Sequence, residues 1–148
     1  FSRIMSLKDG LKKMSKSELS DLSRINLTDN KDTIINKIKK AKTDPMPMPI
    51  NLKDLEERAE AKNLLGIYSS LTNSSLEKSV EIFAGKNFSE FKEKLSVILV
   101  DSIYPISEEI KKLLDDKSYL DNILLEGVEK ANTIASKKIK RIKEIVGF

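Results

Sequence analysis

An apolar stripe in the last thirty residues constrains the fold of this chain more than any other sequence feature. Its members recur at three- and four-residue steps, and they are Leu120, Ile123, Leu124, Val128, Ala131, Ile134, Ala135, Ile139, Ile142 and Ile145. This spacing matches one face of an α-helix, so we expect a long helix that Ser118 caps and Gly147 terminates. Because aromatic residues make up only 5% of the chain and it has four prolines, the composition is also typical of helix-rich proteins.

Helical spacing recurs in the rest of the sequence. We expect helices over residues 29–44, 54–71, 75–84 and 87–114. Asp29 and Ser75 are the expected caps of the first and third of these, and Gly85 closes the third. Pro105 removes one backbone donor from the fourth, which predicts a kink or a break there, with helix again from Ser107.

Two segments do not have this spacing. Residues 2–7 alternate weakly and predict a short strand, whereas residues 8–17 are polar and predict a mobile loop. Three alternating prolines at positions 45, 47 and 49 predict a stiff connector. The expected fold class is therefore all-α, a helical bundle of about five or six helices that is preceded by a short strand and a loop.

The sequence contains neither cysteine nor histidine. Their absence excludes a disulfide framework, a thiolate zinc site and any catalysis that needs an imidazole base. The longest apolar run, Val97 to Val100, is far too short to span a membrane, and the first residues do not resemble a signal peptide. We therefore expect a cytoplasmic protein without a membrane partner.

Residues 13–17 read Lys-Met-Ser-Lys-Ser and place two ammonium groups and two hydroxyls in a polar loop. Such a loop can close over a triphosphate, because Lys13 and Lys16 would neutralise its charge. Polyanion sites more often add a glycine-rich backbone or a helix N-terminus, so solvated lysines are the alternative interpretation. Met14 and Ile4, taken alone, would more often be core residues.

The context of this pentapeptide resembles one family over the whole chain. The matching runs are residues 2–10, 13–17, 23–29, 40–44, 63–68 and 145–148. In order and spacing they resemble bacterial tryptophanyl-tRNA synthetase, a class I aminoacyl-tRNA synthetase, and residues 13–17 match its KMSKS loop. The resemblance covers the C-terminal half of that enzyme. It implies that residues 1–17 are the last catalytic-domain strand and the KMSKS loop, and that residues 18–148 are the C-terminal helical domain on the anticodon side of the tRNA.

The family is a homodimeric tryptophan–tRNA ligase that activates tryptophan with ATP and transfers it to tRNA(Trp). Lys13 and Lys16 match the two lysines that bind the β- and γ-phosphates, and they are the implied catalytic residues. The implied ATP-binding residues are Ile4, Lys13, Met14, Ser15, Lys16 and Ser17. Of these, the two serines either donate to phosphate or shape the loop, whereas Ile4 and Met14 match positions whose backbone meets the adenine. Mg²⁺ would arrive with ATP, and no protein ligands for it are identified.

The family's second nucleotide-binding signature, related to His-Ile-Gly-His, does not occur in these residues, and the chain begins with Phe1 rather than methionine. We therefore expect a fragment of a longer enzyme that is inactive alone.

Two basic ends flank an acidic middle, a distribution that suits a polyanionic partner. In the last expected helix the candidate tRNA-binding residues are Lys137, Lys138, Lys140 and Arg141. A solvated face of a lysine-rich protein would give the same cluster. The competing hypothesis is a non-enzymatic helical module that binds RNA or a protein partner through its basic ends.

Overall fold

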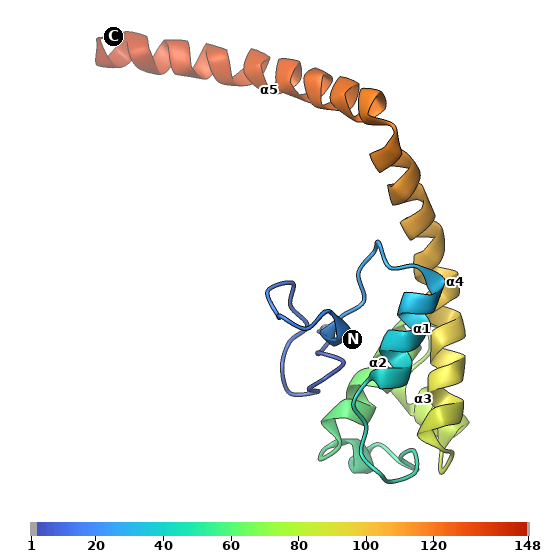
Figure 1. Ribbon diagram of the computed structural model, residues 1–148. Coiled ribbons are helices and arrows are strands. Elements are labelled where there is room, and N and C mark those ends of the chain that lie inside the picture. The colour runs from blue at the N-terminus through green and yellow to red at the C-terminus, as the bar shows by residue number, and fades with distance from the viewer. Residues whose placement is uncertain (1–2, 148) are drawn as a thin grey trace. The chain divides into compact units, whose positions relative to one another are not determined.

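The computed structural model describes residues 3–147, and its contacts divide the chain into two units, Phe1–Glu108 and Glu109–Phe148. The first unit holds helices α1 (Lys31–Lys40), α2 (Ala59–Leu71), α3 (Leu76–Phe83) and most of α4 (Phe88–Asp115), shown in Figure 1. Two short 3-10 helices, η1 (Asp21–Ser23) and η2 (Lys53–Leu55), lie between them in the chain. The second unit holds the end of α4 and helix α5 (Lys117–Val146). The expected all-α class is confirmed, and the domain boundary after Ser17 stays a prediction.

The hydrophobic core lies in the first unit and takes residues from all four of its helices. Ile34 and Ile38 of α1 are fully buried, as is Leu65 of α2. Phe83 of α3 and Phe91 of α4 are also fully buried, and their ring centroids lie 4.8 Å apart with the planes inclined at 76°. This near-perpendicular packing is favoured between aromatic rings, and it joins α3 to α4 at the centre of the core.

Helix ends follow local capping chemistry, although two expected caps were wrong. Ser75 caps α3 as predicted, since its hydroxyl accepts the Lys78 N–H at 3.2 Å. Asn30 caps α1 in place of Asp29, because the Asp29 carboxylate binds Lys37 instead. Asp116 caps α5 in place of Ser118 and accepts the Tyr119 N–H at 3.0 Å. Each observed cap satisfies a backbone donor that the first turn leaves unpaired.

The helix expected over residues 54–71 is interrupted. Its first part forms η2, and α2 begins only at Ala59. Arg58 just before it has φ −117° and ψ 68°, outside the helical region. Its guanidinium contacts both oxygens of Asp44, at 2.7 and 2.9 Å. This paired interaction holds Arg58 in a non-helical conformation, so the helix starts after it.

A break at Pro105 does not occur, because α4 includes this residue within its 28 residues. Proline removes one helical hydrogen bond. Leu99 before it and Ser107 after it are both buried, so packing holds the helix on either side.

The strand expected over residues 2–7 is reduced to one antiparallel bridge between Met5 and Lys13, while Ser2 lies outside the described residues. Strands extend when a second backbone pairs with their free edge. Here the side chain of Asn63 occupies that edge and bonds both backbone polar groups of Met5, each at 2.9 Å. A helix side chain thus takes the place of a second strand.

Helix α5, taken by itself, is a thirty-residue helix that ends at Gly147, whose φ of 85° is left-handed. Its length and its end agree with the prediction. No residue of α5 is buried, and the large apolar residues of its stripe, such as Ile134 and Ile142, are exposed. In the part of the chain that the structure covers, no helix has the length and apolar character required to cross a bilayer.

Candidate phosphate-binding site

The approach to the KMSKS loop is a tight antiparallel turn. The Met14 N–H donates to the Ile4 carbonyl at 3.2 Å, and the Ser6 N–H donates to the Lys12 carbonyl at 2.7 Å. Gly10 lies in the turn between these two segments, where a Cβ would come within 2.6 Å of the Ala59 backbone. Only glycine allows this approach to α2, so the turn is pressed against the start of that helix. Ile4 and Met14, both predicted site residues, are therefore direct backbone neighbours.

Asn63 connects this turn to α2. Its side chain is only 2% exposed. Its carbonyl oxygen accepts the Met5 N–H, and its amide group donates to the Met5 carbonyl. Met5 also pairs with Lys13 across the bridge. Lys13, the first residue of the KMSKS loop, is therefore connected to Asn63 of α2 through Met5. We call this arrangement of Met5, Lys13 and Asn63 the approach anchor.

The two lysines of the loop are exposed. Across residues 3–147, neither Lys13 nor Lys16 takes part in an ion pair, whereas their neighbour Lys12 lies 3.7 Å from Asp9. Two ammonium groups that have no internal counterion can bind an external anion without breaking an existing contact. This is the electrostatic requirement of a phosphate site.

The two serines of the loop bond to each other. The Ser15 and Ser17 hydroxyl oxygens are 2.8 Å apart, and the Ser15 hydroxyl also accepts the Ser17 N–H at 3.3 Å. Side-chain bonds to the backbone two residues ahead stabilise a turn in place of regular structure. These contacts stabilise the turn that carries Lys16, and the choice between shaping the loop and donating to phosphate stays a prediction.

A pocket of about 470 Å³ lies beside the loop. One part of its wall is Met14, Ser15 and Lys16, and the other is the segment from Arg24 to Thr28. This volume lies within the usual range of small-molecule pockets, about 300–1,000 Å³. The loop and the segment that follows η1 therefore enclose the space in which an anion beside Lys16 would lie.

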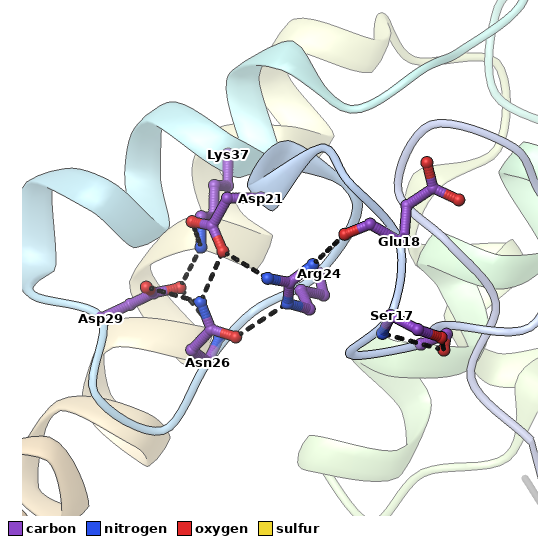
Figure 2. A network of polar contacts seen from close by, with 8 residues as sticks. Ser17, Glu18, Asp21, Arg24, Asn26, Asp29 and Lys37 are labelled. Carbon is purple, nitrogen blue, oxygen red and sulfur yellow. Dashed lines mark hydrogen bonds and ion pairs between the residues drawn. The ribbon is translucent and has the colours of Figure 1, made fainter.

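Beyond Ser17 the chain is held by a network of polar contacts, shown in Figure 2. Arg24 is its centre. Its guanidinium donates to the Glu18 carbonyl at 2.9 Å and to the Asn26 side-chain oxygen at 3.1 Å, and it lies 3.0 Å from Asp21. All three contacts come from different nitrogens of one planar group, which fixes its orientation.

Lys37 of α1 reaches the same network (Figure 2). Its side chain is 1% exposed, and its Nζ lies 2.6 Å from carboxylate oxygens of both Asp21 and Asp29. A buried ammonium is stable only when it is paired and hydrogen-bonded. The hydrogen bond from Lys37, followed by that from Asn26, lowers the pKa of Asp21 below its usual range. We call the set of Asp21, Arg24, Asn26, Asp29 and Lys37 the exit anchor.

The predicted tRNA-binding residues lie on α5, in the second unit. All four side chains are exposed: Lys137, Lys138, Lys140 and Arg141. Among the described residues none of the four forms an ion pair. Their assignment to tRNA stays a prediction.

The residues that hold the loop were missed by sequence reasoning. For Lys37 a signal existed, because it lies three residues after Ile34 and next to Ile38, on the buried face of α1. A lysine among buried apolar positions needs a buried partner. Asn63, between buried Ala61 and Leu64, carries a similar signal. Neither signal reveals the partner, since Asn63 and Met5 are 58 residues apart in sequence.

Comparison with known proteins places the chain among aminoacyl-tRNA synthetases. The model of the family described as tRNA synthetases class I (W and Y) matches residues 1–103. The tryptophan–tRNA ligase of Agrobacterium fabrum is 49% identical over 146 residues, which are 99% of this chain and 41% of that protein. The tryptophan–tRNA ligase of Rickettsia felis is 50% identical over 147 residues, which are 99% of this chain and 44% of that protein.

Among solved structures, tryptophanyl-tRNA synthetase from Campylobacter jejuni, complexed with ADP and tryptophan, matches with a TM-score of 0.77 at 25% identity. The match covers 99% of this chain and 44% of that one. The chain thus spans less than half the length of the proteins that it matches.

Proposed function

The chain belongs to the class I tRNA synthetases of the tryptophan and tyrosine type, and from this premise we propose that it is the C-terminal part of a tryptophan–tRNA ligase. The tryptophan ligases of two organisms are about half identical to it along almost its whole length, which supports tryptophan over tyrosine as the substrate. The observation that carries the proposal is an exposed loop beside a pocket, in which neither Lys13 nor Lys16 forms an ion pair with any of residues 3–147. The proposed reaction joins tryptophan to ATP, releases pyrophosphate and passes the aminoacyl group to tRNA(Trp).

In this proposal Lys13 and Lys16 bind the β- and γ-phosphates of ATP. When the tryptophan carboxylate attacks the α-phosphorus, negative charge builds up on the oxygens of the departing pyrophosphate. Cations that approach these oxygens at that moment stabilise the transition state more than they stabilise bound ATP, so they raise the rate. Ser15 and Ser17 bond to each other and present Lys16 on a defined turn.

The adenine contact assigned to Ile4 and Met14 is restricted by the geometry of the turn. The Met14 N–H and the Ile4 carbonyl already bond to each other. The Ile4 N–H and the Met14 carbonyl are the groups that we propose for the adenine. No group of three or more acidic, histidine or cysteine side chains within the described residues is arranged to hold a metal. We propose that Mg²⁺ arrives with ATP.

The remaining parts of the proposal concern the helical region and the whole enzyme. We assign residues 1–17 to the end of the catalytic domain and residues 18–148 to the helical domain. Lys137, Lys138, Lys140 and Arg141 of α5 would neutralise phosphates of the tRNA, because exposed cations without internal partners suit this role. The full-length enzyme would be a homodimer in the cytoplasm.

Tryptophan-dependent exchange of pyrophosphate into ATP tests the proposal in the full-length protein that contains this chain. Lys16→Ala should lower the activation rate on the order of 10²-fold or more and leave tryptophan affinity nearly unchanged, because the lysine acts mainly in the transition state. Lys12→Ala is the matched control, since Lys12 is the neighbouring exposed lysine and pairs with Asp9. An equal loss of rate and of tryptophan affinity in Lys16→Ala would contradict the assigned role.

The 148 residues alone should show no exchange, and exchange by this piece would contradict the proposed division of the enzyme. The competing RNA-binding module would be supported instead if unrelated RNAs bound as tightly as tRNA(Trp), with the same dependence on salt.

A further inference from the structure

We propose that Arg24 is a positioning residue for the activation step, and that it holds the exit of the KMSKS loop in place while Lys37 holds Arg24 through Asp21. This inference rests on the function proposed above. It extends the machinery from the loop itself to two cations that act through the position of the loop.

The first step is the contact between Arg24 and Glu18. Glu18 directly follows Ser17, and its backbone carbonyl accepts a hydrogen bond from Arg24 at 2.9 Å. This bond comes from a side chain six residues ahead, so it closes the backbone after the loop into a ring. Asp21 and Asn26 hold the other nitrogens of the guanidinium at 3.0 and 3.1 Å. The Glu18 carbonyl therefore has a partner whose own position is fixed.

The second step is the connection from Arg24 to the core. Asp21 bonds Arg24 through one carboxylate oxygen and Lys37 through the other, at 2.6 Å. Lys37 is buried in α1 and also bonds Asp29, whose carboxylate accepts the Asn26 N–H at 2.9 Å. One ammonium thus ties two parts of the segment after the loop to a single helix. Removing it would leave Asp29 without its cation and Asp21 with Arg24 as its one remaining ion-pair partner among the described residues.

Lys16 depends on both ends of the loop for its position. A flexible ammonium stabilises departing charge only when the backbone that carries it reaches the correct place, and a small misplacement can cost a large factor in rate. The approach anchor fixes the loop before Lys13, and the Arg24 bond fixes it after Ser17. Arg24 and Lys16 also line the same pocket. Loss of the bond to Glu18 would leave Lys16 tethered at one end only.

The test uses Arg24→Lys in the full-length protein. This substitution keeps the positive charge near Asp21 but loses the planar group that serves three partners. The matched control is Arg58→Lys, because Arg58 is similarly buried, binds Asp44 through two nitrogens and has no partner in the loop. We expect Arg24→Lys to lower kcat for pyrophosphate exchange on the order of tenfold with the KM for tryptophan unchanged, and Arg58→Lys to leave both within about twofold.

A double-mutant cycle separates positioning from general damage. If Arg24 acts through Lys16, then Arg24→Lys should have little effect in a protein that already carries Lys16→Ala. If the fold-losses of kcat in the two single variants instead multiply in the double variant, Arg24 does not act through Lys16 and the inference is wrong. Equal losses in Arg24→Lys and Arg58→Lys would also overturn it.

Amide hydrogen exchange supplies a readout that does not depend on activity. Arg24→Lys should speed exchange over residues 15–20, and Arg58→Lys should not. Unchanged exchange in both would overturn the inference.

Should Arg24→Lys fail to fold, Asp21→Asn serves as the second variant, because Asp21 is 55% exposed and its substitution breaks the contact from Lys37 to Arg24. It must show the same pattern to a smaller degree, and an unaltered kcat would overturn the inference. A wild-type protein without tryptophan-dependent exchange would refute the proposed function, whereas an active wild type beside an unaffected Arg24→Lys refutes only this inference.

Discussion

The two ends of the KMSKS loop are held by opposite kinds of chemistry. The approach anchor uses neutral groups, since the amide of Asn63 bonds the backbone of Met5. The exit anchor uses charge, since buried Lys37 joins two carboxylates and Asp21 joins Arg24. Neutral backbone bonds depend on shape and burial, whereas ion pairs also respond to pH and salt. One end of the loop is therefore held by bonds that do not titrate, and the other by charges that pH and salt can weaken.

Removing the cation of the exit anchor should have the largest effect on stability. Lys37→Met retains the buried aliphatic volume but leaves Asp21 and Asp29 without their shared partner. Loss of one member of a buried pair costs about 3–5 kcal/mol, and we expect about 3 because Asp21 is half exposed. Chemical denaturation of the chain measures this loss. The double variant Lys37→Met/Asp29→Asn should recover part of it, and no recovery would show that packing, not charge, dominates this end.

Asn63→Ala should break the approach anchor and lower the free energy of unfolding less than Lys37→Met does. The change leaves the Met5 N–H and carbonyl without their side-chain partner, and unpaired buried polar groups cost about 1–3 kcal/mol. We expect about 2 kcal/mol by denaturation, and the cost should stay constant between pH 4 and pH 8, because no titrating group is removed. Ser70→Ala in the same helix is the control, since Ser70 donates only to the Gly66 carbonyl within α2. A cost that varied with pH would mean that the two anchors are coupled.

Much of the helical architecture was predictable because it depends on local spacing. The long helix α5, the cap at Ser75 and the end at Gly147 all follow from residues within one or two turns of each other. Two of the failures had causes outside the first turn of the helix. Asp29 has the chemistry of a cap, but the buried ammonium of Lys37 competes for its carboxylate. Arg58 lies where a helix could continue, but it binds Asp44, fourteen residues earlier.

The candidate site shows the same division between local and distant causes. The two lysines of the KMSKS loop could be identified from five consecutive residues, because the sequence pattern alone marks them and no knowledge of their contacts is required. The anchors were not evident, because each joins segments that meet only after folding: Asn63 reaches Met5, and Lys37 reaches Asp21. Sequence reasoning therefore identifies the groups proposed to contact phosphate and misses the groups that hold them.

A pH titration should give the smallest effect and the clearest contrast between the anchors. The pKa of Asp21 is lowered in the folded chain, first by the hydrogen bond from Lys37. A carboxyl with a lowered folded-state pKa adds stability that is complete above its unfolded pKa, near 4, and is lost as pH falls through the folded value. Asp21→Asn should therefore lower the melting temperature of the chain at pH 7 and make progressively less difference below pH 4. Asn63→Ala must show no such convergence, because its lost bonds do not titrate. If the gap between Asp21→Asn and wild type did not narrow as the pH falls below 4, Asp21 would act through shape, and the two ends of the loop would then be held alike.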